Sequence, residues 1–215
     1  MIPFRTSEEI TGAISAVVTH LSRRGVIGYP TETIYGFGST VSGAAVARLS
    51  ALKGRAPGKP FLLLVASRDM IAQAGLRLTD AGERFAAAFW PGPLTLVLPG
   101  GERELPDALR GPEGGIAVRW TSHPGVSRLV SVLGAPITST SANRPREAPA
   151  ATGAEIEATF AAAVSDGTLL VLDAGVLVPS PPSTVVDCTG AAPRLVREGA
   201  LSTAVLRAVV PALVG

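Results

Sequence analysis

The chain contains few residues of the types that build disulfides and metal sites. Cys188 is its only cysteine, and His20 and His123 are its only histidines. A single cysteine excludes an internal disulfide and a cysteine-based metal cluster, and it is typical of a protein from a reducing compartment. Two histidines leave little material for a zinc site. We therefore predict no metal-binding residues in this chain.

Long hydrophobic runs are also missing. A membrane-spanning helix needs roughly 18 to 20 apolar residues in a row, and the apolar stretch that starts at Leu201 is interrupted by Arg207 and Pro211. Near the start of the chain, Glu8 and Glu9 stand where a signal peptide would have a cationic segment and an apolar run. We expect a cytoplasmic protein that does not contact a membrane.

Charged and aromatic residues are scarce, at 17% and 5% of the chain, and the net charge is +2. This composition argues against RNA binding as the main role, because such surfaces are basic and use aromatic rings for stacking. A local anion site stays open. Hydrophobic residues make up 47%, which is enough for a large core. We expect one domain over residues 1–215, although the proline-rich 179–182 segment could also be a linker.

Strand-like and helix-like apolar patterns alternate along the chain. Thr6 and Glu9 have the spacing of a capping box, and apolar residues follow at helical intervals to near Gly25. We expect further helices at 44–53, 79–90, 123–134 and 154–164, and strands at 25–30, 61–65, 94–99, 116–120, 136–140, 168–173 and 183–188. This alternation is typical of an α/β sheet covered by helices.

Both lysines of the chain, Lys53 and Lys59, lie in the stretch KGRAPGKPF. Glycines next to a lysine suggest a phosphate-binding loop. However, only three residues separate Gly54 from Gly58, and Lys59 is followed by Pro60 instead of a hydroxyl residue, so the stretch is not a Walker A motif. It is either a solvated turn after a helix or a cationic arm that binds an anion by another geometry.

Polar side chains gather where the predicted strands end, which is where open α/β sheets usually bind ligands. The stretches are YPTETIYGFG, KGRAPGK, AVRW, STSAN, STVVD and RLVRE. Each has an ordinary explanation as a turn, a helix cap or an outward-facing strand residue. Together their cations and hydroxyls suit a small anionic substrate. Without a serine, histidine and acid arrangement, we expect catalysis by positioning and charge neutralisation.

These stretches resemble the motifs of the YrdC-like threonylcarbamoyl-AMP synthases. The family's PTETxYGLG, KxR, WPGPLT, AVR with HP, SAN and STVVD motifs correspond here to PTETIYGFG, KGR, WPGPLTLVLP, AVRWTSHP, TSTSAN and PSTVVDCTG, and VREG follows as a late arginine segment. Order and spacing match from about residue 8 to residue 200. Six motifs in one order form a specific signal.

The resemblance implies a single twisted mixed sheet with flanking helices around a basic cavity. It implies a nucleotidyltransferase that converts L-threonine, bicarbonate and ATP into threonylcarbamoyl-AMP and pyrophosphate, the first step in making threonylcarbamoyl-adenosine in tRNA. ATP is then a substrate accompanied by Mg²⁺. The product passes to downstream threonylcarbamoyl-transfer machinery, and a wide basic cavity is also compatible with weak tRNA binding.

Carried over by position, the resemblance assigns residues to two subsites. Those that would hold threonine or its carbamate are Thr33, Arg119, Ser139 and Ser183. Those that would bind ATP are Arg55, Lys59, Ser141, Asn143 and Arg197, with Lys53 and Arg55 as the catalytic cations. On this view KGRAPGK binds the triphosphate through its side chains.

Three positions differ from many family members. Lys59 stands where others have asparagine or histidine, Leu64 where some have a histidine near the threonine, and Pro149 where others have a serine. If alternate residues of strand 61–65 face the cavity, Leu64 gives the amino-acid pocket an apolar wall. Two other functions stay open: a paralogue that adenylates or carbamoylates a different substrate, and an RNA-binding module that uses the same cavity.

Overall fold

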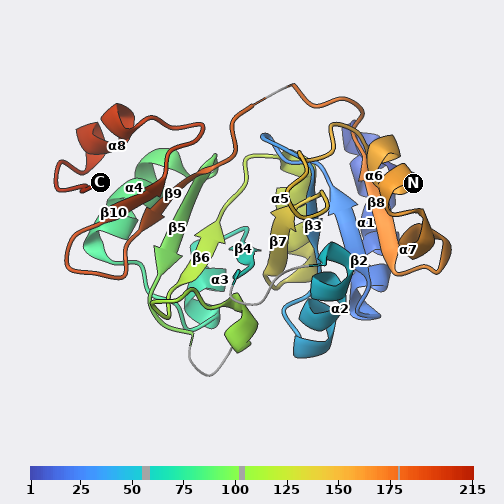
Figure 1. Ribbon diagram of the computed structural model, residues 1–215, viewed down its shortest axis with the longest axis horizontal. Coiled ribbons are helices and arrows are strands. Elements are labelled where there is room, and N and C mark those ends of the chain that lie inside the picture. Colours follow the sequence, from blue (N-terminus) through green and yellow to red (C-terminus); the bar gives the residue numbers. More distant parts are fainter. Residues whose placement is uncertain (55–58, 102–104, 179) are drawn as a thin grey trace.

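The computed structural model describes residues 1–54, 59–101, 105–178 and 180–215. In these residues ten strands form one mixed sheet in the order β1-β8-β2-β3-β7-β4-β6-β5-β9-β10 (Figure 1). The strands are β1 (Ile2–Pro3), β2 (Val26–Tyr29), β3 (Gly36–Gly38), β4 (Leu62–Leu64), β5 (Leu94–Leu98), β6 (Ile116–Arg119), β7 (Ile137–Ser141), β8 (Leu169–Asp173), β9 (Thr184–Asp187) and β10 (Arg194–Arg197). The predicted fold class, a single mixed sheet with flanking helices, is confirmed.

Helices flank this sheet in Figure 1. They are α1 (Ser7–Ser22), α2 (Gly43–Lys53), α3 (Arg68–Gln73), α4 (Asp80–Phe89), α5 (Pro124–Leu133), α6 (Gly153–Thr159), α7 (Ala161–Ser165) and α8 (Thr203–Val209), and a short 3-10 helix spans Asp107–Leu109. Within the described ranges, none of the helices has both the length and the apolar character that crossing a bilayer requires.

Local sequence explains where α1 begins. The Thr6 hydroxyl accepts a hydrogen bond from the backbone N–H of Glu9 at 3.2 Å, and Oε2 of Glu9 accepts one from the backbone N–H of Thr6 at 3.1 Å. This is the predicted capping box, which satisfies two N–H groups that the helix leaves unpaired. Ile10, Ile14 and Val17 follow on the buried face, so the predicted helical periodicity is confirmed.

Strand β7 lies in the middle of the sheet and joins its two halves. It pairs antiparallel with β3 on one side and with β4 on the other. Ser141 is opposite Gly36, and Ser139 is opposite Leu62. Because side chains alternate along a strand, Ser139 and Ser141 face the same side of the sheet. The YPTETIYGFG and STSAN stretches, about 100 residues apart in the chain, therefore meet at one place.

The structure differs from the predicted elements in two instructive places. The sequence does not predict β3, whose residues are Gly36, Phe37 and Gly38, because glycine is a poor strand former by itself. The single helix predicted at 154–164 is divided into α6 and α7 at Phe160. The Phe160 ring packs edge-on against Phe37 with centroids 4.9 Å apart, so tertiary packing accompanies the break.

Candidate functional site

A cavity of about 540 Å³ lies against the middle of the sheet. Its walls come from the loop after β2, from strands β3, β4, β5, β6 and β7, and from the segment that leads into β9. The predicted site residues that line it are Thr33, Lys59, Arg119, Ser139, Ser141, Ser183 and Arg197. Three of these are cations, and no described lining residue carries a carboxylate.

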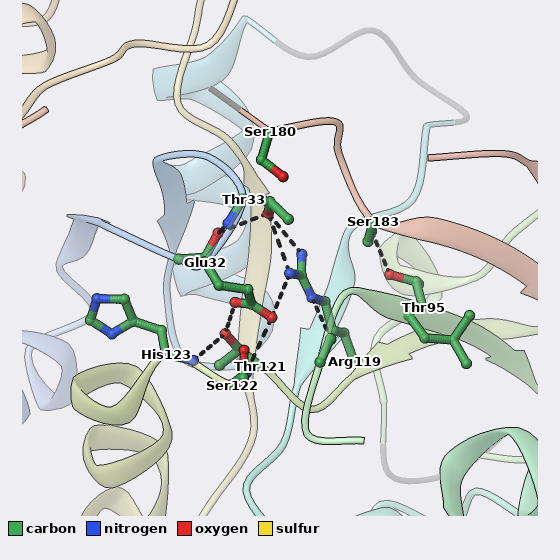
Figure 2. Close-up of polar contacts among 12 residues, drawn as sticks. Glu32, Thr33, Thr95, Arg119, Thr121, Ser122, His123, Ser180 and Ser183 are labelled. Atoms are coloured by element: carbon green, nitrogen blue, oxygen red, sulfur yellow. Dashed lines mark hydrogen bonds and ion pairs between the residues drawn. The ribbon is translucent and has the colours of Figure 1, made fainter. Parts of the chain in front are cut away.

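Arg119 is the most constrained cation of the site. It ends β6, is 5% exposed, and its Nη2 lies 2.9 Å from Oε1 of Glu32. Both Nη1 and Nη2 are 3.3 Å from the Thr33 hydroxyl, and Nε donates to the carbonyl of Gly92 at 3.2 Å. Figure 2 shows the guanidinium held between Glu32 and Thr33. Its position is therefore set before any ligand binds.

Glu32 is a functional candidate that the sequence analysis missed. Its Oε1 accepts a hydrogen bond from the backbone N–H of Ser122 at 3.1 Å, and its Oε2 accepts one from the Thr121 hydroxyl. Burial raises the pKa of Glu32, but the charge of Arg119 and the hydrogen bond from Thr121 outweigh it and hold the pKa below its ordinary value. Glu32 is therefore an ionised partner of Arg119. Its place in PTET was a signal, but only the fold shows which cation it pairs with.

Two buried hydroxyl pairs support the predicted serines. Tyr29 Oη donates to Ser139 Oγ at 2.6 Å, and the hydroxyls of Thr95 and Ser183 are 2.8 Å apart. Tyr29 and Thr95 were also missed, because each reads as an ordinary member of a buried strand. Both serines line the cavity with a hydrogen-bond partner already in place, Thr95 in the lining itself and Tyr29 outside it.

Arg197 brings a second guanidinium to the cavity. Its Nη2 donates to the carbonyl of Ser183 at 2.7 Å. Burial first, and then the charge of Arg119, lower the pKa of Arg197. The two arginines are thus close enough to repel each other. An anion bound beside both would relieve that repulsion.

Lys53 lies outside the cavity lining, in contact with the STSAN turn. Its Nζ donates to the backbone carbonyls of Ser141 at 2.6 Å and Asn143 at 2.7 Å, and it also bonds the Asn143 side-chain oxygen. The lysine is only 6% exposed. Asn143 is likewise absent from the lining, whereas Ser141 belongs to it. Arg55 lies outside the described residues.

The three unusual positions fall in different places. Lys59 and Pro149 line the cavity, but Leu64 does not. The expectation that Leu64 forms a wall of the pocket is therefore corrected: Leu62 is the lining residue of β4. The two leucines face the same side of the sheet, because they are two residues apart, but they lie at different places along it. Leu62 is opposite Ser139 at the cavity, whereas Leu64 is opposite Ile137 and 1% exposed in the core.

Cys188 and His123 have structural surroundings. Burial, and then the charge of Asp187, raise the pKa of the Cys188 thiol to about 12, so the thiol stays neutral near pH 7. Nδ1 of His123 accepts a hydrogen bond from the backbone of Val126 and caps α5. Across the described ranges, no group of three or more histidine, cysteine, aspartate or glutamate side chains could hold a metal ion.

Two curated sequences similar to this chain carry the same name. A threonylcarbamoyl-AMP synthase of Chromohalobacter salexigens is 40% identical over 168 residues, which cover 75% of this chain and 89% of that protein. The threonylcarbamoyl-AMP synthase of Thiobacillus denitrificans is 37% identical over 183 residues, which cover 85% of this chain and 94% of that protein. The similarity therefore extends over nearly the full length of both relatives.

Solved structures of Sua5 and YciO are also similar to this chain. P. abyssi Sua5 complexed with L-threonine superposes with a TM-score of 0.89 at 27% identity, covering 100% of this chain and 62% of that one. E. coli YciO gives a TM-score of 0.79 at 25% identity, covering 94% of this chain and 95% of that one. This chain thus spans about three fifths of the Sua5 protein. The family model for Sua5, YciO and YrdC, described as telomere recombination, matches residues 19–199, and the chain belongs to this family.

Proposed function

We propose that this protein is an L-threonylcarbamoyladenylate synthase, a nucleotidyltransferase that forms threonylcarbamoyl-AMP and pyrophosphate from L-threonine, bicarbonate and ATP. The observation that carries the proposal is the convergence of Arg119, Thr33, Ser139 and Ser183 in one cavity with Lys59 and Arg197. The names of the curated relatives support the same reaction. The product would pass to downstream machinery that transfers the threonylcarbamoyl group to tRNA.

We assign the threonine end of the cavity to Arg119 and the hydroxyls around it. A guanidinium binds a carboxylate by charge-assisted hydrogen bonds, and Thr33, Ser139 and Ser183 supply hydroxyls that can orient the rest of a small polar substrate. The crystal structure of P. abyssi Sua5 in complex with L-threonine supports this choice of substrate. Glu32 would hold the Arg119 guanidinium in place while threonine is converted into its carbamate.

We assign the nucleotide end to Lys59, Ser141 and Arg197, and propose that the cavity is electropositive there. These side chains line the same cavity, and Lys53 and Asn143 support the turn that carries Ser141. Arg55, which lies between Lys53 and Lys59 in the sequence, remains a proposed phosphate ligand. Magnesium would enter with the phosphates of ATP as part of the substrate, and no step of the reaction is assigned to it.

The reaction that this arrangement supports has two bond-forming steps. The threonine amine attacks the carbon of bicarbonate, and loss of water leaves a carbamate. A carbamate oxygen then attacks the α-phosphorus of ATP, the bond from that phosphorus to pyrophosphate breaks, and a mixed anhydride remains. The protein would contribute by holding two anions close together, by neutralising the charge that develops on the phosphates, and by excluding water from a labile product.

We also propose that residues 1–215 act as one domain. The first strand, β1, and the last, β10, form the two edges of the same sheet, so both ends of the chain contribute to one structure. The cavity draws its lining from residues between Thr31 and Arg197. Removing either end would therefore be expected to expose the neighbouring strand, β8 or β9, as a new edge of the sheet.

Pyrophosphate release from ATP tests the proposed reaction. We expect release only when L-threonine and bicarbonate are both present, because the carbamate that attacks the phosphate needs both. The measurement is coupled detection of pyrophosphate with each substrate omitted in turn. Mass spectrometry of the nucleotide product would identify threonylcarbamoyl-AMP. Release that continues without threonine or without bicarbonate would contradict the proposal.

Amino-acid selectivity is a second test of the same pocket. Serine lacks only a methyl group, which an apolar contact discriminates by about tenfold to 200-fold. Valine should be rejected more strongly, because it replaces a hydroxyl with a methyl and leaves buried polar groups unpaired. The measurement compares kcat/KM for threonine, serine and valine at saturating ATP and bicarbonate. Valine equal to threonine would favour a paralogue with another substrate.

A further inference from the structure

Tyr29 places a buried hydroxyl directly behind the cavity. It is the last residue of β2, is fully buried, and its Oη lies 2.6 Å from Ser139 Oγ. Ser139 lines the cavity and Tyr29 does not. In the part of the chain that the structure describes, this bond is the only hydrogen bond found for either hydroxyl. The pair therefore connects the protein interior with the ligand site through a single contact.

The ring of Tyr29 is fixed by the glycines of β3. A Cβ atom at Gly38 would lie 2.9 Å from Cε1 of Tyr29, and one at Gly36 would lie 3.3 Å from Cζ. Real Cβ atoms do not approach other atoms as closely as the first of these distances. The absence of side chains at these two positions lets the ring pack closely against β3. Tyr29 thus has a defined orientation, and its hydroxyl points at Ser139.

Tyr29 Oη is the donor in the hydrogen bond to Ser139. Burial raises the pKa of Tyr29 far above its ordinary value, and this outweighs the lowering by the bond to Ser139 and by Arg119. Tyr29 therefore keeps its proton near neutral pH and has a hydrogen to donate. Ser139 Oγ is the acceptor in this bond. Its own hydrogen is then directed away from Tyr29.

We infer that Tyr29 is a positioning residue that makes Ser139 a hydrogen-bond donor toward the bound amino acid. Because a serine hydroxyl has a single hydrogen, accepting from Tyr29 leaves that hydrogen for a ligand oxygen. Ser139 is 8% exposed, with its open side toward the cavity that also contains Arg119. A hydroxyl donor and a guanidinium in the same cavity suit an anionic ligand oxygen, such as that of a carboxylate. The inference rests on the proposed function, because it assumes that the ligand is threonine.

Tyr29→Phe tests the inference by removing one oxygen and leaving the ring. We expect the affinity for L-threonine, measured by calorimetry without nucleotide, to fall roughly twofold to tenfold, the value of one ordinary hydrogen bond. KM for threonine should rise by a similar factor while KM for ATP stays unchanged. In a Ser139→Ala background the same Tyr29→Phe change should have little further effect, because the hydroxyl it orients is gone.

Tyr35→Phe is the matched control. Tyr35 lies in the segment between β2 and β3, is fully buried, and its hydroxyl bonds the Gly175 carbonyl at 2.8 Å and the Ala174 backbone N–H at 2.9 Å, outside the cavity. We expect it to lose thermal stability and keep wild-type affinity for threonine. If Tyr29→Phe binds threonine like the wild type, or if both variants weaken binding in proportion to their loss of stability, the inference is wrong. A wild-type protein that fails to bind threonine would overturn the proposed function as well.

Discussion

Arg119→Gln is expected to lower kcat/KM for threonine about tenfold to 150-fold, the value of a charge-assisted hydrogen bond of about 1.5 to 3 kcal/mol. The physical reason is that Arg119 is a nearly buried cation, held by Glu32 and Thr33 before the ligand arrives. Glutamine keeps part of the volume but cannot pair with a carboxylate by charge. The measurement is steady-state pyrophosphate release, with direct binding of L-threonine as a second readout.

Loss of stability has to be separated from loss of binding in this variant. Removing Arg119 leaves the partly buried Glu32 carboxylate without its cation, which destabilises the fold. The double variant Glu32→Gln, Arg119→Gln removes both charges, so we expect its thermal stability to recover while threonine binding stays weak. Arg110→Gln is a control, because Arg110 bonds backbone carbonyls, including that of Gly100, and does not line the cavity. Wild-type kcat/KM in Arg119→Gln would show that the threonine anion binds elsewhere.

Lys53→Met is expected to lower turnover by a similar factor, about tenfold to 150-fold, but through ATP. The Lys53 ammonium bonds the partly buried carbonyls of Ser141 and Asn143, so its removal takes a hydrogen-bond donor from both and loosens the turn that carries Ser141. We expect a raised KM for ATP and nearly unchanged binding of L-threonine in the absence of nucleotide. A contact between the Lys53 ammonium and the triphosphate in the complex would have the same consequence: a raised KM for ATP with unchanged threonine binding.

Arg144→Ala provides the comparison for Lys53→Met. Arg144 directly follows Asn143, is exposed, and its Nη2 donates to the carbonyl of Thr159 at 3.0 Å, away from the cavity lining. The Arg144→Ala substitution removes a neighbouring positive charge but leaves the carbonyls that Lys53 binds unchanged. Turnover should therefore stay close to that of the wild type. Equal losses in the two variants would attribute the effect to net charge. Unchanged turnover in Lys53→Met would remove this lysine from the proposed ATP end.

Much of the site could be predicted from the sequence because its residues occur in recognisable stretches. The hydroxyls of Thr33, Ser139 and Ser183 and the cation of Arg119 were all predicted, and the structure places them in one cavity. The partners that hold them were not predicted. Glu32 and Tyr29 are far from Arg119 and Ser139 along the chain, and such contacts depend on which strands become neighbours.

The sequence alone determined the features that depend on neighbouring residues: the capping box at Thr6, the apolar periodicity of α1, and most strands of the sheet. The tertiary structure decided the features that depend on register and burial. Pairing of β7 with β4 put Leu62 rather than Leu64 at the cavity, and packing allowed Gly36 and Gly38 to form a strand. The physical reason is that a local pattern sets the conformation of a segment, whereas the surroundings of each position along a strand depend on the strands and loops that pack beside it.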